Sequence, residues 1–315
     1  MAGFKIGICE PDNFSIDALS ILKTIGEVSF FNEYGDDEEK LRRFVLDKSA
    51  IFVRLRYRIS EELLSGTDSL KYICSPTTGL NHIIVSDRYK IISLKGEYEF
   101  LSTIRATPEH VFGLTVALLR NYKDAFRSRE DNGWNRDTYR GYELYHNKIG
   151  IIGMGRIGKI LSGYYKAFGS EVLYYDIEDV EEDYGTKCES IEELCNRANI
   201  ILLEADYRPE NIKMIGQHEL ELLKGKYFVN AARGELVDED AMIEMIKEDY
   251  FAGVALDVVV DETLTENNIK KISELACNHN LILTPHIGGA TYTSMARTEI
   301  FVAEKLKELI SHGIY

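Results

Sequence analysis

The chain has 315 residues, enough for two domains of ordinary size and a substantial buried core. Hydrophobic residues make up 45% of it and charged residues 28%, a globular composition that excludes wholesale disorder. The formal net charge of −15 disfavours phosphate backbones and anionic lipid, so we expect neither a nucleic-acid nor a membrane partner.

The cysteine content and the lengths of the apolar stretches indicate in which cellular compartment the protein resides. The five cysteines are odd in number, include no CxxC pair and stand in no His/Cys cluster, so we expect no disulfide framework and no metal site. The N-terminus does not resemble a secretory signal, and the apolar stretch 111–119 is shorter than the roughly 20 residues that span a membrane. We therefore expect a soluble, cytoplasmic protein.

Strand and helix patterns alternate through the first hundred residues. The predicted elements are strands at 4–9, 28–31, 50–55, 70–75 and 90–94, and helices at 15–25 and 37–47. This alternation predicts a parallel sheet with helices on both faces. We expect one small doubly wound unit over residues 1–104.

The pattern changes at Pro108, where an unbroken helix is predicted to run to Phe126. Thr107 suits its N-cap, and Pro108 suits the first helical position. Apolar residues cover more than one face, so we expect this helix to be buried between domains or at a subunit contact. Such a surface on a monomer would favour aggregation, and we therefore expect a homodimer.

A second alternating series begins at Lys148. The predicted elements are strands at 148–153, 171–175, 199–203, 226–230, 251–258 and 281–284, and helices at 156–168, 191–197, 218–223, 239–247 and 293–312. Six parallel strands fit a dinucleotide-binding Rossmann sheet, which we place at residues 105–286. The fold class is therefore α/β with two doubly wound parallel-sheet domains.

A glycine motif follows the first strand of this series. Gly153 permits a tight turn, Gly155 lets backbone approach a pyrophosphate, and Gly158 allows the helix to pack closely on the strand. A glycine-rich turn without a ligand is the alternative for such a motif alone. Asp176 ends the next strand, 176 − 158 = 18 residues later, where its carboxylate can bind ribose hydroxyls. Together these features favour a dinucleotide.

The residues after Asp176 bear on which dinucleotide binds. An acidic run without Arg or Lys follows, consisting of Glu178, Asp179, Glu181, Glu182 and Asp183. This charge would repel a 2′-phosphate, so NAD is favoured over NADP as the cofactor. A solvated loop is the alternative explanation of the run, but Asp176 alone favours the same cofactor.

Three later segments place Arg233, Glu262 and His286 at or after strand ends, where open α/β sheets bind ligands. An arginine can bind a carboxylate at two points, and a histidine can exchange a proton with an alcohol or ketone. A surface ion pair, a solvated glutamate and a core histidine are the alternatives for each residue alone. Their joint occurrence favours a catalytic site.

Several ordered motifs resemble the D-isomer-specific 2-hydroxyacid dehydrogenases. They are residues 77–83 (TTGLNHI), 108–110 (PEH), 151–158 (IIGMGRIG), 228–238 (FVNAARGELVD), 256–262 (LDVVVDE) and 284–289 (TPHIGG). The resemblance covers nearly the whole chain. It implies a Rossmann NAD-binding domain and a smaller flavodoxin-like substrate domain, to which the C-terminal residues 287–315 return. It also implies that the helices near 108–126 and 293–312 cross between the domains.

The resemblance also implies roles by position. Arg233 would hold the substrate, His286 would act as acid and base, and Glu262 would orient and charge that histidine. The implied cofactor contacts are Thr78, Gly153, Gly155, Arg156, Ile157, Gly158, Asp176, Ala231, Asp257 and Gly288. The implied substrate contacts are Thr77, Thr78, Gly79 and Arg233. Arg54 is a further candidate substrate contact, which rests on the arginine row described below and not on the resemblance.

The sequence departs from the family pattern at two places. Thr263 follows Glu262 where proline is usual, and residues 203–207 (LEADY) replace a Leu-His-x-Pro-Leu segment. Glu204 and Asp206 therefore suggest added negative charge near the nicotinamide.

An arginine row, Arg54, Arg56 and Arg58, would share one face if its strand continued. An exposed polar edge is the simpler explanation, and an anion clamp for the substrate is the functional one.

These observations predict an NAD-dependent D-2-hydroxyacid dehydrogenase, acting on a small 2-hydroxy or 2-oxo acid. An NAD-sensing scaffold or corepressor on the same fold is the alternative. The sequence leaves open which acid is used.

Overall fold

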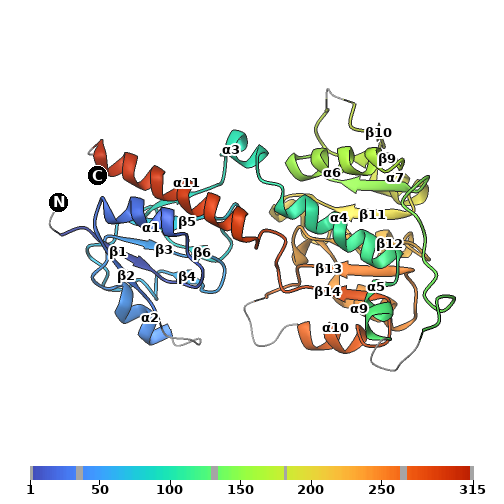
Figure 1. Ribbon diagram of the computed structural model, residues 1–315, viewed down its shortest axis with the longest axis horizontal. Helices are drawn as coiled ribbons and strands as arrows, with labels where there is room; N and C mark the ends of the chain where they lie inside the picture. The colour runs from blue at the N-terminus through green and yellow to red at the C-terminus, as the bar shows by residue number, and fades with distance from the viewer. Residues whose placement is uncertain (1–2, 33–37, 129–133, 181–182, 263–267, 313–315) are drawn as a thin grey trace. The chain divides into compact units, whose positions relative to one another are not determined.

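The computed structural model describes residues 3–32, 38–128, 134–180, 183–262 and 268–312. The chain divides into two compact units, each built on a parallel sheet (Figure 1). Unit 1 comprises residues 1–104 and 290–315, and unit 2 comprises residues 105–289. The sequence placed these boundaries after residues 104 and 286.

Unit 1 contains a five-stranded sheet in the order β2-β1-β3-β5-β7. Its strands are β1 (Lys5–Ile8), β2 (Glu27–Phe30), β3 (Ala50–Phe52), β5 (Tyr72–Ser75) and β7 (Lys90–Ser93), while β4 (Ile59–Ser60) and β6 (Ile83–Ile84) pair separately. Its helices are α1 (Ile16–Lys23), α2 (Glu38–Val45), α3 (Tyr98–Ser102) and α11 (Tyr292–Ser311). This is the flavodoxin-like strand order.

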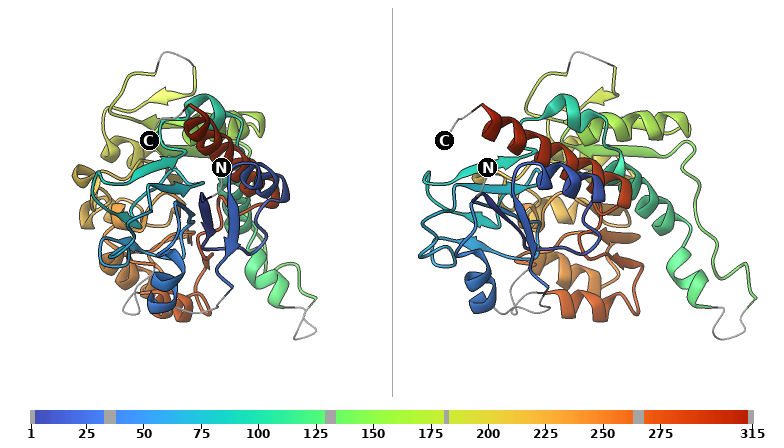
Figure 2. Two further views of the ribbon diagram at one scale, coloured as in Figure 1. Left: turned by 90° about the vertical axis from the view of Figure 1, so that its left-hand side faces the viewer. Right: turned by 60° about the vertical axis from the view of Figure 1, so that its left-hand side comes forward.

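Apolar layers cover both faces of the unit 1 sheet. Ile6 packs with Leu22 of α1 and Leu306 of α11, and Ile51 packs with Leu41 of α2 in a second cluster. Helices α1 and α11 lie side by side, as both views of Figure 2 show. The C-terminal helix is therefore part of the core of unit 1, with the first strands of the chain.

Unit 2 contains a seven-stranded parallel sheet in the order β10-β9-β8-β11-β12-β13-β14. Its strands are β8 (Lys148–Ile152), β9 (Glu171–Tyr175), β10 (Thr186–Lys187), β11 (Ile200–Leu203), β12 (Tyr227–Asn230), β13 (Gly253–Leu256) and β14 (Leu281–Leu283). The order reverses between β8 and β11, which is the switch point of a Rossmann sheet. The predicted fold class is confirmed, and β10 adds a short strand that was not predicted.

Helices cover both faces of the unit 2 sheet. They are α4 (Ala106–Leu119), α5 (Tyr122–Arg127), α6 (Arg156–Ala167), α7 (Ile191–Arg197), α8 (Gln217–Glu221), α9 (Glu239–Lys247) and α10 (Ile269–Leu275), with short 3-10 turns at Pro209–Asn211 and Gly234–Leu236. Helices α4 and α6 contribute to one apolar cluster, and α7 to α10 contribute to another. Helix α10 was not predicted.

The prediction of one helix from Pro108 to Phe126 is wrong in two respects. Helix α4 begins at Ala106, so Thr107 lies in its first turn and is not its N-cap. The helix stops before Asn121, whose φ of 49° is left-handed, a conformation that asparagine tolerates better than most residues. The apolar faces of α4 pack on α6, β12, β13 and β14, so unit 2 itself accounts for its excess of apolar residues.

No helix in the described ranges is both long and apolar enough to cross a bilayer.

Candidate active site

Three neighbouring strands of unit 2 carry the predicted catalytic residues. Arg233 follows β12, Glu262 follows β13 and His286 follows β14, and these strands are adjacent and parallel. Their carboxyl ends therefore share one edge of the sheet. This is the edge at which open α/β sheets bind ligands.

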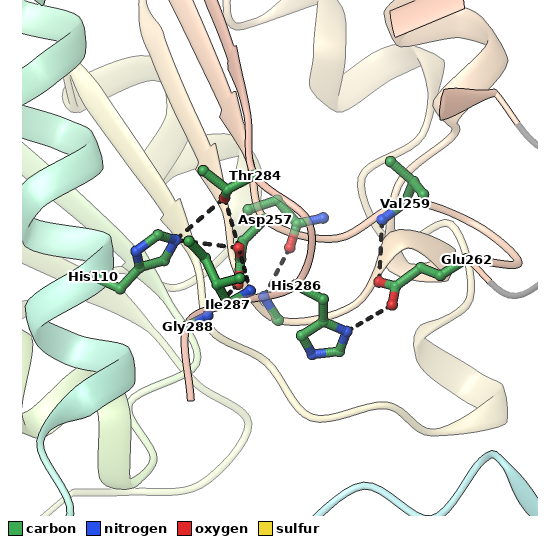
Figure 3. Close-up of polar contacts among 10 residues, drawn as sticks. His110, Asp257, Val259, Glu262, Thr284, His286, Ile287 and Gly288 are labelled. Carbon is green, nitrogen blue, oxygen red and sulfur yellow. Dashed lines mark hydrogen bonds and ion pairs between the residues drawn. The ribbon is translucent and has the colours of Figure 1, made fainter. Parts of the chain in front are cut away.

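His286 and Glu262 lie in direct contact. His286 Nδ1 is 2.7 Å from Glu262 Oε2, and both side chains are half-buried (Figure 3). The backbone of His286 is left-handed, with a φ of 51°, a conformation that is costly for a residue with a side chain. Its N–H donates to the carbonyl oxygens of Asp257 (2.9 Å) and Thr284 (3.0 Å), which hold the turn. The other ring nitrogen, Nε2, is on the side of the ring away from Glu262.

Asp257 is buried beneath this turn. It accepts hydrogen bonds from the Thr284 hydroxyl at 2.6 Å and from the N–H groups of Ile287 at 2.9 Å and Gly288 at 2.7 Å. Burial alone raises the pKa of Asp257, but hydrogen bonds from His110, Thr284 and these two N–H groups outweigh burial and lower it. The Asp257 carboxylate thus holds the turn that carries His286, and its contact with the cofactor stays a prediction.

Gly288 is required for this arrangement, because a Cβ there would lie 2.9 Å from Asp257 Oδ2. Its placement is explained by packing against Asp257, and a contact with the cofactor stays a prediction. Thr263 lies outside the described residues.

Arg233 lies in a loop that packs against the loop after β13. A Cβ at Gly234 would be 2.1 Å from the backbone carbon of Val259, so only glycine permits this approach. Asn230 holds the loop by donating to the Arg233 carbonyl oxygen at 3.0 Å and accepting from Ala232 N–H at 3.0 Å. Among the described residues, Arg233 forms no ion pair, and its Nη1 donates to the Ala232 carbonyl oxygen at 2.6 Å. Most of its guanidinium donors are therefore available for an anion.

The glycine motif fits a pyrophosphate. Gly153 has a φ of 99°, and a Cβ there would lie 2.7 Å from the N–H nitrogen of Ala205. A Cβ at Gly158 would lie 2.3 Å from the Gly153 carbonyl oxygen, so helix and strand touch at this point. Open space surrounds Gly155, which directly precedes α6. A phosphate can therefore approach the backbone at the N-terminus of α6, where Arg156 and Ile157 begin the helix.

Asp176 links the end of β9 to the glycine motif. Its carboxylate accepts from the N–H of Met154 at 2.6 Å and from that of Glu178 at 2.9 Å. An ionised carboxylate has about four acceptor positions, so two remain for the hydroxyls of a ribose. The carboxylate is thus fixed in place beside the motif and fits the adenosine end of NAD.

The acidic run after Asp176 is partly neutralised by lysines distant in sequence. Asp179 pairs with Lys187 at 2.6 Å, and Asp183 pairs with Lys166 at 3.1 Å. Glu181 and Glu182 lie outside the described residues. Cofactor preference therefore depends on Asp176 more than on the run.

Glu204 does not add negative charge as the sequence suggested. Both carboxyl oxygens are buried and, within the described ranges, have no hydrogen-bond partner. Burial raises the pKa of Glu204 to about 8, although the nearby Arg156 opposes the shift, so the group is largely neutral at pH 7. Asp206 is exposed and paired with Arg208 at 2.8 Å.

Replacing Glu204 with glutamine should stabilise the protein increasingly as the pH rises from 5 to 8. The folded chain keeps this carboxyl protonated over a range in which the unfolded chain releases the proton, so wild-type stability falls there. The gain should reach a few kcal/mol by pH 8. Urea unfolding at pH 5, 6.5 and 8 measures it, with Asp206→Asn as an exposed control. A gain that does not vary with pH would contradict a neutral Glu204.

The remaining predicted contacts lie in unit 1 and at the end of β12. Thr77 Oγ1 donates to the Gly79 carbonyl oxygen at 2.9 Å and lies 2.8 Å from Ser75 Oγ, which fixes the loop after β5. Thr78 is exposed on this loop, while Ala231 is buried directly after β12. Contacts of Thr77, Thr78 and Gly79 with substrate, and of Thr78 and Ala231 with cofactor, stay predictions.

The expected arginine row does not form, because β3 ends at Phe52. Arg54 Nη2 donates to the carbonyl oxygens of Glu10 (2.8 Å) and Asp12 (2.9 Å), and its Nε lies 3.3 Å from the buried Glu299. Arg56 pairs with Asp12. These contacts give Arg54 a structural role within unit 1, and its contact with substrate stays a prediction.

Sequence reasoning missed one polar contact at this site, which is made by a histidine side chain. His110 of α4 reaches Thr284 and Asp257 with its Nε2, at 3.2 Å in each case. The only signal in the sequence was its place in residues 108–110, far along the chain from both partners.

Comparison with known proteins identifies the family. Residues 112–288 match the family described as D-isomer specific 2-hydroxyacid dehydrogenase, NAD binding domain. The D-3-phosphoglycerate dehydrogenase of Methanocaldococcus jannaschii is 30% identical over an alignment that covers 97% of this chain and 57% of that protein. D-3-phosphoglycerate dehydrogenase 2 of Saccharomyces cerevisiae is 31% identical over 96% of this chain and 66% of that protein. This chain spans about half to two thirds of the length of these curated relatives.

A solved structure agrees over nearly the full chain. D-lactate dehydrogenase from Aquifex aeolicus, complexed with NAD and lactic acid, is 26% identical with a TM-score of 0.82, covering 98% of this chain and 96% of that chain. The resemblance drawn from the motifs is thereby confirmed. The chain belongs to the D-isomer specific 2-hydroxyacid dehydrogenase family.

Proposed function

We propose that this protein is an NAD-dependent dehydrogenase that transfers a hydride between NAD(H) and a small D-2-hydroxy or 2-oxo acid. The observation that carries the proposal is the 2.7 Å contact between His286 and Glu262 at the edge of a Rossmann sheet. Arg233 follows the adjacent strand, and the glycine motif and Asp176 fit a dinucleotide. We assign unit 2 to NAD and unit 1 to the substrate.

Each residue has a distinct part in reduction of a 2-oxo acid. The Arg233 guanidinium binds the substrate carboxylate and aligns the carbonyl group. NADH, which the glycine motif and Asp176 would hold, would supply the hydride to the carbonyl carbon. His286 Nε2 donates a proton to the carbonyl oxygen, and the Glu262 carboxylate stabilises the imidazolium before that transfer. In the oxidative direction His286 accepts the proton from the hydroxyl group.

The substrate class rests on the family and on its named relatives. The substrates named for D-3-phosphoglycerate and D-lactate dehydrogenases both have a hydroxyl group beside a carboxylate. An arginine that binds the carboxylate and a histidine that exchanges a proton with the hydroxyl match this pair of groups. We propose that Thr77, Thr78 and Gly79 contact the substrate from unit 1.

NADH consumption with a panel of 2-oxo acids tests this function. We expect steady turnover with at least one member, and the reverse reaction with NAD and the corresponding D-2-hydroxy acid. NADH binding without turnover across the panel would refute the dehydrogenase and favour an NAD-sensing scaffold or corepressor. A purified protein that binds neither NADH nor NAD would refute both.

NAD(H) should be preferred over NADP(H) by at least tenfold in kcat/KM. The Asp176 carboxylate lies where the ribose is expected, and a 2′-phosphate would meet its charge. Replacing Asp176 with serine should narrow the preference, whereas Asp183→Asn, which removes an exposed acid of the run, should not. Equal use of both cofactors by the wild type would contradict the assignment of Asp176.

We propose a homodimer in the cytoplasm. Four large aromatic side chains of unit 2 are exposed between residues 126 and 145, namely Phe126, Trp134, Tyr142 and Tyr145. Trp134 is 96% exposed, which is unusual for this residue unless a partner covers it. All five cysteines are free, which supports a reducing compartment.

Light scattering at micromolar concentration should give twice the chain mass, and Trp134→Lys should shift the protein toward monomer. Tyr292→Lys, at an exposed aromatic of unit 1, serves as the control. A wild-type monomer would contradict the dimer.

A further inference from the structure

The structure assigns a positioning role to His110, which acts through Thr284 and Asp257 to hold His286 in its left-handed turn. This inference rests on the proposed function, because it concerns the residue that transfers the proton. His110 belongs to α4, whereas its partners follow β13 and β14, so the three come from separate parts of unit 2 (Figure 3).

The directions of the hydrogen bonds follow from the chemistry of the groups. The Thr284 hydroxyl has one proton, which it donates to Asp257 Oδ1 at 2.6 Å. Thr284 Oγ1 can therefore only accept from His110 Nε2, which lies 3.2 Å away. The same nitrogen lies 3.2 Å from Asp257 Oδ1, which also only accepts. His110 must carry its proton on Nε2, so the chain of donors runs from His110 to Thr284 to Asp257.

The Asp257 carboxylate receives four donors in total. These are the Thr284 hydroxyl, His110 Nε2 and the N–H groups of Ile287 and Gly288. Three of these donors reach Oδ1 and one reaches Oδ2, so both oxygens of the carboxylate are held in place. Because Asp257 is only 2% exposed, water does not replace a donor that is removed.

These contacts act on His286 through the backbone on both of its sides. Thr284 precedes the histidine by two residues, and Ile287 and Gly288 follow it directly. The His286 N–H itself donates to the Asp257 carbonyl oxygen at 2.9 Å. A left-handed non-glycine residue persists only where its surroundings hold it, and here Asp257 does so with its backbone and its carboxylate. His110 holds that carboxylate from the opposite side.

The substitution His110→Leu should lower kcat for 2-oxo acid reduction by about 10- to 100-fold. The KM for substrate and the Kd for NADH should change by less than about threefold, because the donors of Arg233 and of the glycine motif are untouched. His110→Gln places an amide nitrogen near the position of Nε2 and should restore most of kcat. Thr284→Val removes the connecting hydroxyl with little change of shape and should reproduce the loss, which guards against a folding defect in one variant.

Hydrogen exchange at Ile287 and Gly288 provides a readout independent of turnover. Both amides should lose protection in His110→Leu and Thr284→Val and keep it in His110→Gln. His279→Leu is the matched control, since His279 forms a similar pair with Asp249 (2.6 Å) before β14 rather than after it. That variant should leave both the two amides and kcat unchanged.

The two proposals fail in different ways. Wild-type protein without turnover would refute the dehydrogenase, while exchange at the two amides would still decide the role of His110. Unchanged protection and unchanged kcat in both His110→Leu and Thr284→Val would overturn the positioning role. So would a loss of kcat that His110→Gln does not restore.

Discussion

Replacing His286 with alanine should lower kcat for 2-oxo acid reduction by about 10²–10⁴-fold while NADH binding stays nearly intact. In the proposed mechanism the variant loses the proton donor for the carbonyl oxygen, whereas the glycine motif and Asp176 lie after other strands of the sheet. Steady-state kinetics together with NADH fluorescence titration separate the two effects. His279→Ala, which removes an imidazole from the other end of β14, should leave kcat unchanged.

The partner of His286 is tested by Glu262→Gln. The imidazole remains but loses the carboxylate that lies 2.7 Å from its Nδ1. The kcat for 2-oxo acid reduction should therefore fall, but by less than in His286→Ala, because the proton donor itself is still present. Steady-state kinetics of the two variants measure the difference. An unchanged kcat in Glu262→Gln would remove Glu262 from the mechanism, and an unchanged kcat in His286→Ala would remove the histidine.

Replacing Arg233 with alanine should raise the KM for the 2-oxo acid and lower kcat, reducing kcat/KM by about 10²–10³-fold. In the proposed mechanism the guanidinium binds the carboxylate before and during hydride transfer, and two hydrogen bonds to a charged group are worth about 3–4 kcal/mol. Its loop is held by Asn230 and by the close approach of Gly234 to Val259, so the backbone should survive the change. Measured KM and kcat for substrate, with the KM for NADH as reference, check this.

Arg208→Ala is the matched control, because Arg208 is exposed and pairs only with Asp206 among the contacts described. It should leave all three constants unchanged. An Arg233 variant that alters only the KM for NADH would place this arginine at the cofactor instead of the substrate.

The sheets were predictable because buried parallel strands have continuous apolar runs. Each of the six strands predicted in unit 2 is present, and the glycine motif lies directly after the first of them. The contact between Glu262 and His286 brings together two residues that the sequence had placed at or after the ends of two successive predicted strands. The fold class determines the order of the strands in a parallel sheet. Because these two strands are neighbours in that order, the residues that follow them lie close together.

Other features depend on contacts between distant segments, which periodicity does not contain. Helix α4 ends before the predicted end at Phe126, because Asn121 adopts a left-handed conformation. No proline or glycine marks this position in the sequence. Arg54 follows a strand that stops at Phe52, and its partners Glu10 and Glu299 lie at opposite ends of the chain. The neutral state of Glu204 arises from burial, which the charge of a sequence segment does not reveal.

His110 is the clearest example at the site. A lone histidine on an apolar helix is usually a core residue, and its partners Thr284 and Asp257 are about 150 to 170 positions away in the sequence. Only the packing of α4 on β13 and β14 brings them together. The same packing explains why Asp257 holds the His286 turn, a role that its motif did not suggest.

Hydride transfer to a 2-oxo acid is the central claim, and isotope transfer tests it most directly. The wild-type protein is incubated with NADH deuterated at both C4 positions and with the best 2-oxo acid of the panel. The product is then analysed by mass spectrometry and chiral chromatography. We predict a D-2-hydroxy acid with one deuterium at C2. A product without deuterium at C2, or one of the L configuration, would contradict the assigned reaction.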